Sequence, residues 1–317
     1  MELKLKSEIL EYPPNVVQGI RKKHNLDQPG RMEEAIEILN DWIKKQNHFL
    51  KKDFPSNYLE TCLISCKGSI ERTKIRLDRL CTLRTLLPEF FEKVNPKKDL
   101  YGLENLVGGP LPKLDSNYYR TYIMKNTGSG YGADIFLNYY KLQILTSEYL
   151  RMNDYTDGFY IIFDYTDINL MDLMTALNLV ELRNILSVLM QGYGMRIKGI
   201  HLIVSNSLSS SIMEMFVNLI KQVLTEKIRK RLYVHKTLDS LYEHVPREVL
   251  PRDYGGDEKM TLREIYDKWL DVLSSDEHMN FMKEINKARV DESLRMDGKF
   301  NEDYLGLPGS FRTLNVD

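Results

Sequence analysis

The stretch Gly-Ile-His-Leu-Ile-Val at residues 199–204 decides the fold class, because it is short, almost wholly apolar and rich in β-branched residues, as a buried strand is. An amphipathic helix is expected to follow over Ile212–Leu224, and a further short strand over Leu232–His235. Upstream, Phe159–Asp164 has the composition of another buried strand, and Asp172–Leu189 is expected to form a helix. Strands that alternate with helices predict an α/β sheet with parallel pairs.

The same alternation continues outward in both directions. Tyr118–Lys125 is expected to form a strand and Ile135–Arg151 a helix, while Asp257–Leu273 predicts a late amphipathic helix. Between Val94 and Asp115, glycines and prolines recur so often that we expect no regular element and place a domain boundary there. From Ser274 onward the chain is polar, and we expect it to be irregular.

The first hundred residues predict helices only. Apolar residues recur at helical spacing over Glu33–Lys45 and again over Ser69–Leu87, which Pro88 ends. We therefore expect three parts: a helical domain over residues 1–95, an α/β domain over 96–274, and a tail over 275–317 that packs on the body.

The composition bounds the functional classes. The chain has 317 residues, of which 43% are hydrophobic, enough for a large core, and its 44 basic residues balance 45 acidic ones. Bulk charge therefore does not favour a nucleic-acid partner. No apolar run approaches the ~20 residues of a membrane span, and the first residues do not resemble a secretory signal. Three cysteines fit reduced thiols, so we expect a cytoplasmic protein that could associate with membranes peripherally.

Motifs for chemistry are weak. The six histidines are scattered, so we expect no metal site, and we expect no catalytic residue and no cofactor. We interpret His201, inside an apolar strand, as a hydrogen-bonded core histidine, and Ser209–Ser211 as a helix N-cap region. The glycine-rich turn at residues 128–132 and Asp164, at the end of a strand, leave a nucleotide-dependent enzyme as a remaining alternative.

Two neighbouring helical runs have alternative interpretations. The apolar arc of Ile212–Leu224 is wider than one contact with a sheet requires, which fits either core packing or a lid over an apolar cavity. In the run that follows, Lys227 and Arg231 are one helical turn apart. Such a pair is usually a solvated helix face, but it also suits an anionic lipid headgroup.

The chain resembles the CRAL-TRIO lipid-binding family. The resemblance rests on residues 194–256, above all on Leu-Pro-Arg-Asp-Tyr-Gly-Gly at residues 250–256, which ends them. The helical part is similar to the family's N-terminal domain at residues 66–74, 82–84 and 88–89. The ending Gly-Ser-Phe-Arg-Thr-Leu-Asn-Val-Asp, within residues 306–317, is similar to that of α-tocopherol-transfer-like members from arthropods.

This resemblance implies a helical domain before an α/β domain with a mixed, largely parallel sheet that floors a lipid cavity. It implies a non-enzymatic carrier that binds and transfers a small hydrophobic ligand such as a tocopherol or a retinoid. The helix at Ile212–Leu224 would be a mobile gate, and release would be triggered at a membrane. A lipid-sensing or phosphoinositide-sensing module without bulk transfer is the alternative. The implied ligand-binding residues are Tyr140, Gln143, Ser147, Phe159, Phe163, Ile185, Val188, Leu189, Tyr193, Met195, Ile197, Ile200, Ile212 and Phe216.

The implied partners are this lipophile and, transiently, an anionic membrane surface or phosphoinositide; no nucleic acid is expected. Headgroup contact would involve Arg196, Lys227 and Arg231. Two departures from the family bear on these implications. The usual Asn-x-Pro after the strand is replaced by a longer segment, residues 204–210, which affects the hinge of the gate. A basic residue of the N-terminal helix is lost at residues 62–64, which weakens the expected phosphoinositide contact.

Overall fold

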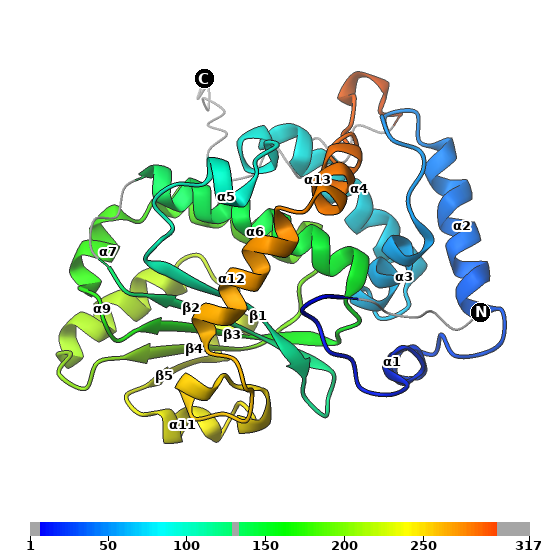
Figure 1. Ribbon diagram of the computed structural model, residues 1–317. Helices are drawn as coiled ribbons and strands as arrows, with labels where there is room; N and C mark the ends of the chain where they lie inside the picture. Colours follow the sequence, from blue (N-terminus) through cyan, green and yellow to red (C-terminus); the bar gives the residue numbers. More distant parts are fainter. Residues whose placement is uncertain (1–6, 129–132, 297–317) are drawn as a thin grey trace, which may run out of the picture.

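The computed structural model describes residues 7–128 and 133–296, and one five-stranded sheet lies at its centre (Figure 1). The strands lie side by side in chain order, β1-β2-β3-β4-β5. β1 and β2 are antiparallel, and every later pair is parallel. The predicted mixed, largely parallel sheet is therefore confirmed. The strand bounds are β1 Leu106–Leu114, β2 Tyr119–Asn126, β3 Gly158–Tyr165, β4 Ile197–Val204 and β5 Leu232–His235.

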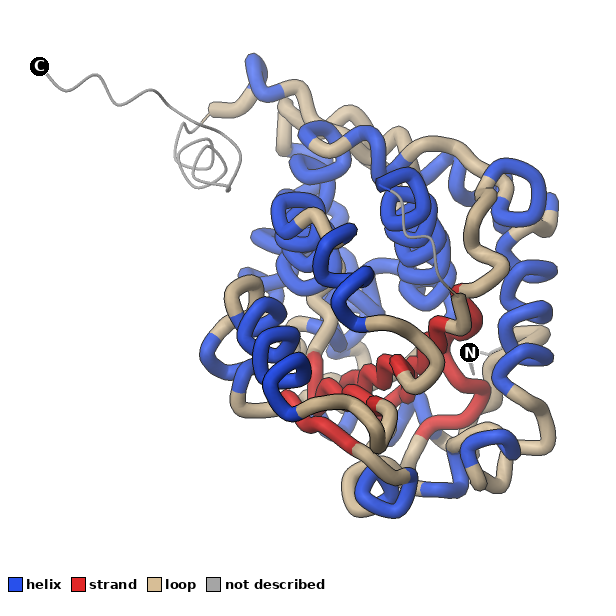
Figure 2. The backbone as a smooth tube through the Cα atoms, turned by 90° about the vertical axis from the view of Figure 1, so that its left-hand side faces the viewer, coloured by secondary structure: helices blue, strands red, loops and turns tan. Residues whose placement is uncertain are grey.

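Helices cover both faces of the sheet. In Figure 1 the long helix α6 lies above the strands and the short α11 lies below them, and Figure 2 shows helices on both sides of the sheet. α12 packs against the edge strand β1. The helices of this part are α6 Ala133–Asn153, α7 Leu170–Ala176, α8 Leu179–Ser187, the π-helical turn η2 Val188–Gly192, α9 Ser210–Lys221, α10 Glu226–Arg229, α11 Leu238–Tyr242, the 3-10 turns η3 Arg247–Val249 and η4 Arg252–Tyr254, α12 Leu262–Leu273, α13 Asp276–Ile285 and the 3-10 turn η5 Glu292–Leu294.

The N-terminal part is helical, as predicted. α3 packs against α6 and α4 packs against η2, so the N-terminal helices lean on the same helices that cover the sheet. One continuous apolar core joins both parts. The division at residue 95 therefore stays a prediction. The elements are α1 Val16–Lys23, α2 Arg31–Lys45, α3 Ser56–Ser65, α4 Ile70–Leu86, the 3-10 turn η1 Pro88–Phe91 and α5 Pro96–Asp99.

The expectation of no regular element between residues 94 and 115 is wrong, because β1 lies there. Its glycines make room for neighbours: a side chain at Gly108 would collide with the β2 backbone, and one at Gly109 with Trp269. The Trp269 indole donates a hydrogen bond to the carbonyl of Pro110 at 2.8 Å. Prolines are tolerated here because β1 is an edge strand, which needs fewer backbone donors.

Three helical predictions need correction. The helix expected over residues 172–189 is two helices, α7 and α8, because Asn178 starts a new helix by accepting hydrogen bonds from the amides of Val180 and Glu181. The helix expected from residue 257 begins at Leu262, where Thr261 and Glu264 form a capping box. The irregular tail expected from Ser274 contains α13.

The prediction that the histidine inside β4 is a hydrogen-bonded core residue is confirmed. His201 is fully buried, and its Nδ1 lies 2.9 Å from Nε2 of His235. Burial lowers the pKa of His201 to about 3, helped by the nearby His235 and His244, so the ring is neutral at pH 7. All three cysteines lie within the described residues and are buried without disulfide bonds.

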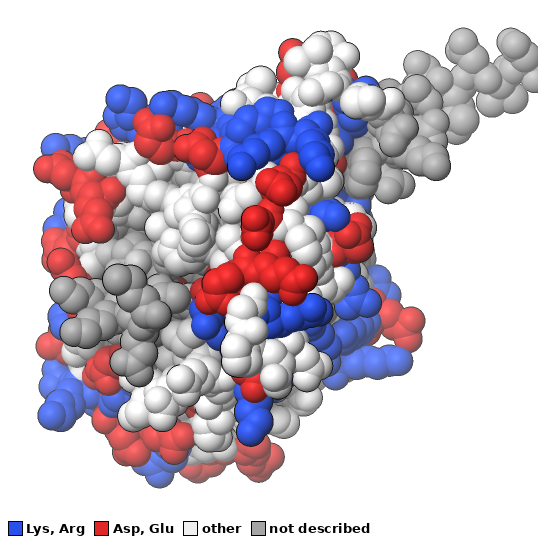
Figure 3. Space-filling model, turned by 90° about the vertical axis from the view of Figure 1, so that its right-hand side faces the viewer, with Lys and Arg blue, Asp and Glu red and all other residues white. Residues whose placement is uncertain are grey.

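No single helix in the described part of the chain combines the length and the apolar composition of a membrane span. The helices Leu170–Ala176 and Leu179–Gly192 would satisfy both criteria only when joined across a bend of 80°. On the face seen in Figure 3, acidic and basic side chains are interspersed, in keeping with a net charge of −1.

Candidate functional site

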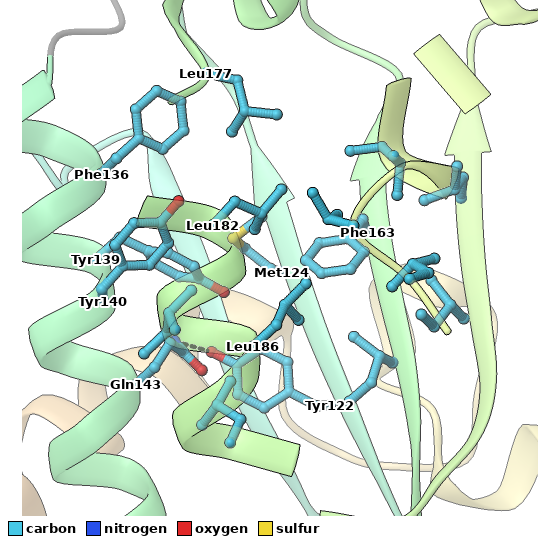
Figure 4. A pocket seen from close by; sticks show the side chains of 18 of the residues that line it. Tyr122, Met124, Phe136, Tyr139, Tyr140, Gln143, Phe163, Leu177, Leu182 and Leu186 are labelled. Carbon is cyan, nitrogen blue, oxygen red and sulfur yellow. Dashed lines mark hydrogen bonds between the residues drawn. The ribbon is translucent and has the colours of Figure 1, made fainter. Parts of the chain in front are cut away.

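An apolar cavity of about 180 Å³ lies between the sheet and the helices above it. Its floor consists of side chains from β2, β3 and β4 with the first residue of β1, and its walls come from α6, from α7 through η2, and from α9 with the residues after it. Figure 4 shows side chains from these elements converging on one space. The lining residues are Leu106, Tyr122, Met124, Asn126, Phe136, Tyr139, Tyr140, Gln143, Ile161, Phe163, Tyr165, Leu173, Leu177, Leu182, Ile185, Leu186, Leu189, Met190, Met195, Ile197, Ile200, Leu202, Phe216, Ile220, Val223 and Leu224.

The lining is uncharged. Within the described chain it includes no Lys, Arg, His, Asp or Glu, and its polar groups are the amides of Asn126 and Gln143 and four tyrosine hydroxyls. The Gln143 amide donates a hydrogen bond of 2.6 Å to the hydroxyl of Tyr122 (Figure 4). Burial raises the pKa of Tyr122, so this hydroxyl stays neutral. Such a cavity suits an apolar molecule with at most a few uncharged polar groups.

Most of the predicted ligand-binding residues meet in this one cavity. They come from α6, β3, α8, η2, the start of β4 and α9, which are far apart in sequence. The predicted residues that line it are Tyr140, Gln143, Phe163, Ile185, Leu189, Met195, Ile197, Ile200 and Phe216.

The remaining predicted residues lie elsewhere. Ser147, Phe159 and Tyr193 line a second, smaller cavity of about 60 Å³, because they lie further along α6, at the start of β3 and after η2. Val188 is fully buried in a cluster with side chains of α4, on the far side of its helix. Ile212 is half-buried at the start of α9 and lies outside the cavity lining.

Several lining residues were missed in the sequence. Alternation along β2 places Tyr122, Met124 and Asn126 on the cavity side, and the same alternation along β3 adds Ile161 to Phe163. A period-two pattern was therefore present in both strands. It did not show which of the two faces of each strand borders a cavity and which borders packed helices.

The comparisons with known proteins agree with this architecture. The model of the CRAL/TRIO domain matches residues 111–256, which include all five strands except the first residues of β1. This match covers a little less than half of the chain. A second model, described as a Pinta-like UBA domain, matches residues 28–100.

Curated relatives carry the name "Alpha-tocopherol transfer protein-like". The mouse protein is 26% identical over 238 residues, and the human protein is 28% identical over 232 residues. Each alignment covers 70% of this chain and 64% of the relative. The chain thus spans less than two thirds of these relatives. A solved structure titled "Crystal structure of Sfh5" aligns with a TM-score of 0.42 and 12% identity, over 87% of this chain and 99% of that one.

One wall of the cavity, formed by α9, buries few of its side chains completely. Of the side chains on α9, only Phe216 is buried among the described residues, and its ring meets Tyr165 edge-on at 5.5 Å. Met215 on the same helix is 49% exposed. α9 begins where the Ser209 hydroxyl accepts a hydrogen bond from the amide of Ile212, so the interpretation of this serine as an N-cap is confirmed.

The opposite wall is anchored by a buried ion pair. Arg84 on α4 donates to a carboxylate oxygen of Glu148 on α6 and to the carbonyl of Ala288 at 2.8 Å. The Tyr193 hydroxyl donates to the same Glu148 oxygen at 2.6 Å. Burial and the Glu148 charge raise the pKa of Tyr193, so it remains a hydrogen-bond donor. This network joins α4 and α6 to the end of η2.

The three cations predicted to contact a headgroup do not share one helix face. Arg196 pairs with Asp157, and Arg231 donates to the carbonyl of Ile197, so both lie at the start of β4. Lys227 lies on α10, which ends at Arg229, so Lys227 and Arg231 do not share a helix face as expected. Both Arg196 and Arg231 are already engaged by protein groups, and Lys227 is exposed.

Asp157 is surrounded by more positive charge than it neutralises. Lys23 lies at 2.6 Å, His24 at 2.8 Å and Lys198 at 3.8 Å from its carboxylate oxygens, in addition to Arg196. Burial alone would raise the pKa of Asp157, but hydrogen bonds from His24 and Lys23 and the charge of Arg196 hold it below its usual range. This surface therefore carries a net positive charge at pH 7.

The turn at residues 250–256, on which the family resemblance mainly rests, has a structural explanation. Gly255 takes a left-handed conformation, and a side chain at Gly256 would collide with the backbone of Leu250. The turn places the Tyr254 hydroxyl 2.6 Å from the carboxylate of Asp164, which also accepts from Thr166. Asp164 is thus used within the fold. The glycine-rich turn falls mostly outside the described residues, at 129–132.

Proposed function

We propose that this protein binds a small lipophilic molecule in the apolar cavity and transfers it between membranes. The observation that carries the proposal is an uncharged cavity with one loosely held wall inside a CRAL/TRIO domain. The names of the curated relatives support a tocopherol-like ligand, and a retinoid or a similar lipid would suit the same lining. The ending at residues 306–317, outside the described residues, supports an arthropod origin.

The size of the cavity bears on the mechanism. An engineered cavity of about 150 Å³ accepts benzene, so about 180 Å³ does not hold a tocopherol without expansion. We infer that the ligand-bound form has α9 displaced outward. Burial of roughly 400 Å² of ligand surface would contribute about 10 kcal/mol at ~25 cal/mol/Å². Association costs of several kcal/mol reduce this gain, which leaves a nanomolar to micromolar affinity.

We propose α9 as the gate and residues 205–209 as its hinge. The helix has an apolar inner side, with Phe216 and Ile220 facing the cavity, and its only fully buried side chain among the described residues is Phe216. Opening therefore exposes apolar surface that a bilayer would cover. The cations around Asp157, together with Lys227 and Arg231, would attract anionic headgroups during this step.

The direct test is to purify the protein, extract it with organic solvent and analyse the extract by mass spectrometry. The expected result is a co-purifying lipophile, or a stoichiometric complex after incubation with α-tocopherol or retinol. A preparation that retains neither, while remaining folded by circular dichroism, contradicts the proposal.

A second candidate is a lipid or phosphoinositide sensor that binds without bulk transfer. The net positive surface around Asp157 favours it, because a sensor needs a membrane-contacting face as much as a cavity. A vesicle-to-vesicle assay separates the two functions. A carrier moves labelled ligand from donor to acceptor vesicles at catalytic amounts of protein, whereas a sensor binds the ligand and leaves its distribution unchanged.

A further inference from the structure

The last described residues lie across the N-terminal helices, and we call residues 286–296 the strap. Val290 forms an antiparallel bridge with Phe49, in the loop that follows α2. The amide of Val290 also donates a hydrogen bond of 2.9 Å to the Thr85 hydroxyl on α4. The strap is therefore held by α4 on one side and by the loop after α2 on the other.

The strap runs along α4 toward the N-terminus of that helix. Val290 contacts Thr85 near the end of α4. Farther along the strap, Arg295 donates to the Thr82 hydroxyl at 3.0 Å and to the Asp78 carboxylate at 2.7 Å and 3.1 Å. The side chains of Arg295 and Asp78 are both buried at this contact. A chain that continues in the same direction passes over the first two turns of α4.

A groove of about 230 Å³ lies where this direction leads, between the end of α2 with the loop after it and the first turns of α4. We call it the strap groove. Its apolar side chains are Trp42, Ile75 and Met296, of which Ile75 is 45% exposed and Met296 84%. Single exposed apolar side chains are ordinary, but several around one groove are typical of a contact surface.

The strap ends at the rim of the strap groove. Met296 is the last residue that the structure describes, and its sulfur accepts a hydrogen bond of 3.8 Å from the Asn47 amide. Trp42 meets the ring of Phe49 edge-on at 5.5 Å and also lines the groove. The next residues of the chain therefore start beside a half-buried indole ring.

The charges of the strap groove are not balanced within it. Lys74 pairs with Glu71, and Asp78 pairs with Arg295. Lys45, at the end of α2, also lines the groove and has no ion pair among residues 7–128 and 133–296. The groove thus offers one unneutralised cation beside its apolar side chains.

The chain after Met296 is long enough to fill the strap groove. From Asp78 back to Glu71, α4 rises by about 10 Å at 1.5 Å per residue. Three or four residues of extended chain cover about the same length. Phe300 is therefore within reach of the whole groove from its rim.

The composition of these residues also suits the groove. Residues 297–304 read Asp-Gly-Lys-Phe-Asn-Glu-Asp-Tyr, which contains two large rings, three acids and one lysine. The rings can cover apolar surface, and the excess of acids complements the charge of Lys45.

We propose that the strap groove is the docking site of the chain's own residues 297–304, with the ring of Phe300 against Trp42 and Ile75. Docking extends the contact of the strap over the first turns of α4. It also gives the expected packing of the tail on the body a definite place. The inference is independent of the proposed carrier function, because none of the groove residues lines the apolar cavity.

The first test is photocrosslinking in the full-length chain. The photoreactive residue p-benzoylphenylalanine replaces Ile75, and crosslinked peptides are identified by mass spectrometry. The expected result is a crosslink within one chain to residues 297–304. The matched control carries the same residue in place of Leu86, which is 47% exposed at the other end of α4 and should give no crosslink to that segment.

A second measurement leaves the groove unaltered. The chain has two tryptophans, and Trp269 is only 2% exposed, so a change in quenching by acrylamide reports Trp42. In the full-length chain, Phe300→Ser should increase the quenching and move the emission to longer wavelength. Phe311→Ser, outside the proposed docking segment, should change neither.

The results that would overturn the proposal are distinct. A crosslink from position 75 that joins two chains, seen as a covalent dimer on a denaturing gel, would assign the groove to a second copy. A folded protein whose position 75 gives no crosslink to residues 297–304, and whose Trp42 is quenched equally in wild type and Phe300→Ser, would show that these residues do not dock there.

Discussion

Helices α4 and α9 both carry apolar faces inward, yet they are held in very different ways. Eight side chains of α4 are buried, including Arg84 in its ion pair with Glu148, whereas α9 buries Phe216 alone among the described residues. α4 stands behind η2, and α9 covers the cavity from the other side. This difference supports the proposal that the wall backed by α4 is a fixed wall and that the wall formed by α9 opens.

The largest expected effect comes from the fixed wall. Arg84→Leu leaves the buried Glu148 carboxylate without its cationic partner, which typically costs about 3–5 kcal/mol. Urea unfolding should therefore show a large loss of stability. The matched control on the same helix is Lys74→Leu, which breaks an exposed pair with Glu71 and should cost less than about 1 kcal/mol. Equal losses in both variants would contradict the anchoring role of Arg84.

Acid should lower the free energy of unfolding through a buried histidine on α13, the helix that packs against α6. Burial lowers the pKa of His278 on α13 to about 4, despite a backbone hydrogen bond that favours its charged form. Between about pH 4 and pH 6.5 the unfolded chain binds a proton that the folded chain does not, so stability is full above this window and is lost as pH falls through it.

From pH 7 to pH 5 this single group accounts for a loss of about 2 kcal/mol. His278→Gln should make the pH profile of the unfolding free energy flatter, while His201, also buried and neutral, leaves a residual slope. A profile with the same slope in wild type and variant would show that the His278 pKa is not depressed.

Filling the cavity tests its role without touching the fixed wall. Leu186→Trp places a larger side chain in the lining and should weaken binding of a lipophilic dye by about tenfold or more, since overpacking leaves no room for a ligand. Leu86→Trp makes the same chemical change on the exposed side of α4, where Leu86 is 47% exposed, and should leave dye binding unchanged. Equal dye binding in both variants would place the dye elsewhere.

The smallest effect is expected on α9 itself. Met215→Ser changes a side chain that is 49% exposed and should alter the free energy of unfolding by less than about 0.5 kcal/mol. Leu83→Ser, at a fully buried position of α4, should cost several kcal/mol by the same measurement. If the two costs were similar, the proposed contrast between the helices would be lost.

The sequence predicts the elements better than their termini. Apolar periodicity located β3, β4, β5 and the long helices, because each buries a regular face. It failed at β1, where Gly108, Gly109 and Pro110 look like a turn. Gly108 is explained by the close approach of the β2 backbone, and Gly109 and Pro110 by the packing of Trp269. It also joined α7 and α8, because the Asn178 cap that separates them is a local hydrogen bond without a hydrophobic signal.

The cavity is harder to predict than the fold. A resemblance to a family carried over positions such as Gln143 and Phe216, but it could not show that Ser147 and Phe159 line a different, smaller space. Nor could it show that Tyr122 would meet Gln143, because that contact depends on how far β2 and α6 lie apart. Side-chain volumes in three dimensions decide which apolar residues border empty space and which fill it.

The most direct test of the central claim is hydrogen exchange, followed by mass spectrometry, on peptides from α9 and α4 with and without bound α-tocopherol. The account predicts that residues 210–221 exchange much faster than residues 70–86 in the free protein and become protected when the ligand binds, while α4 hardly changes. Equally slow exchange in both helices, unaffected by ligand, would contradict a cavity that opens at α9.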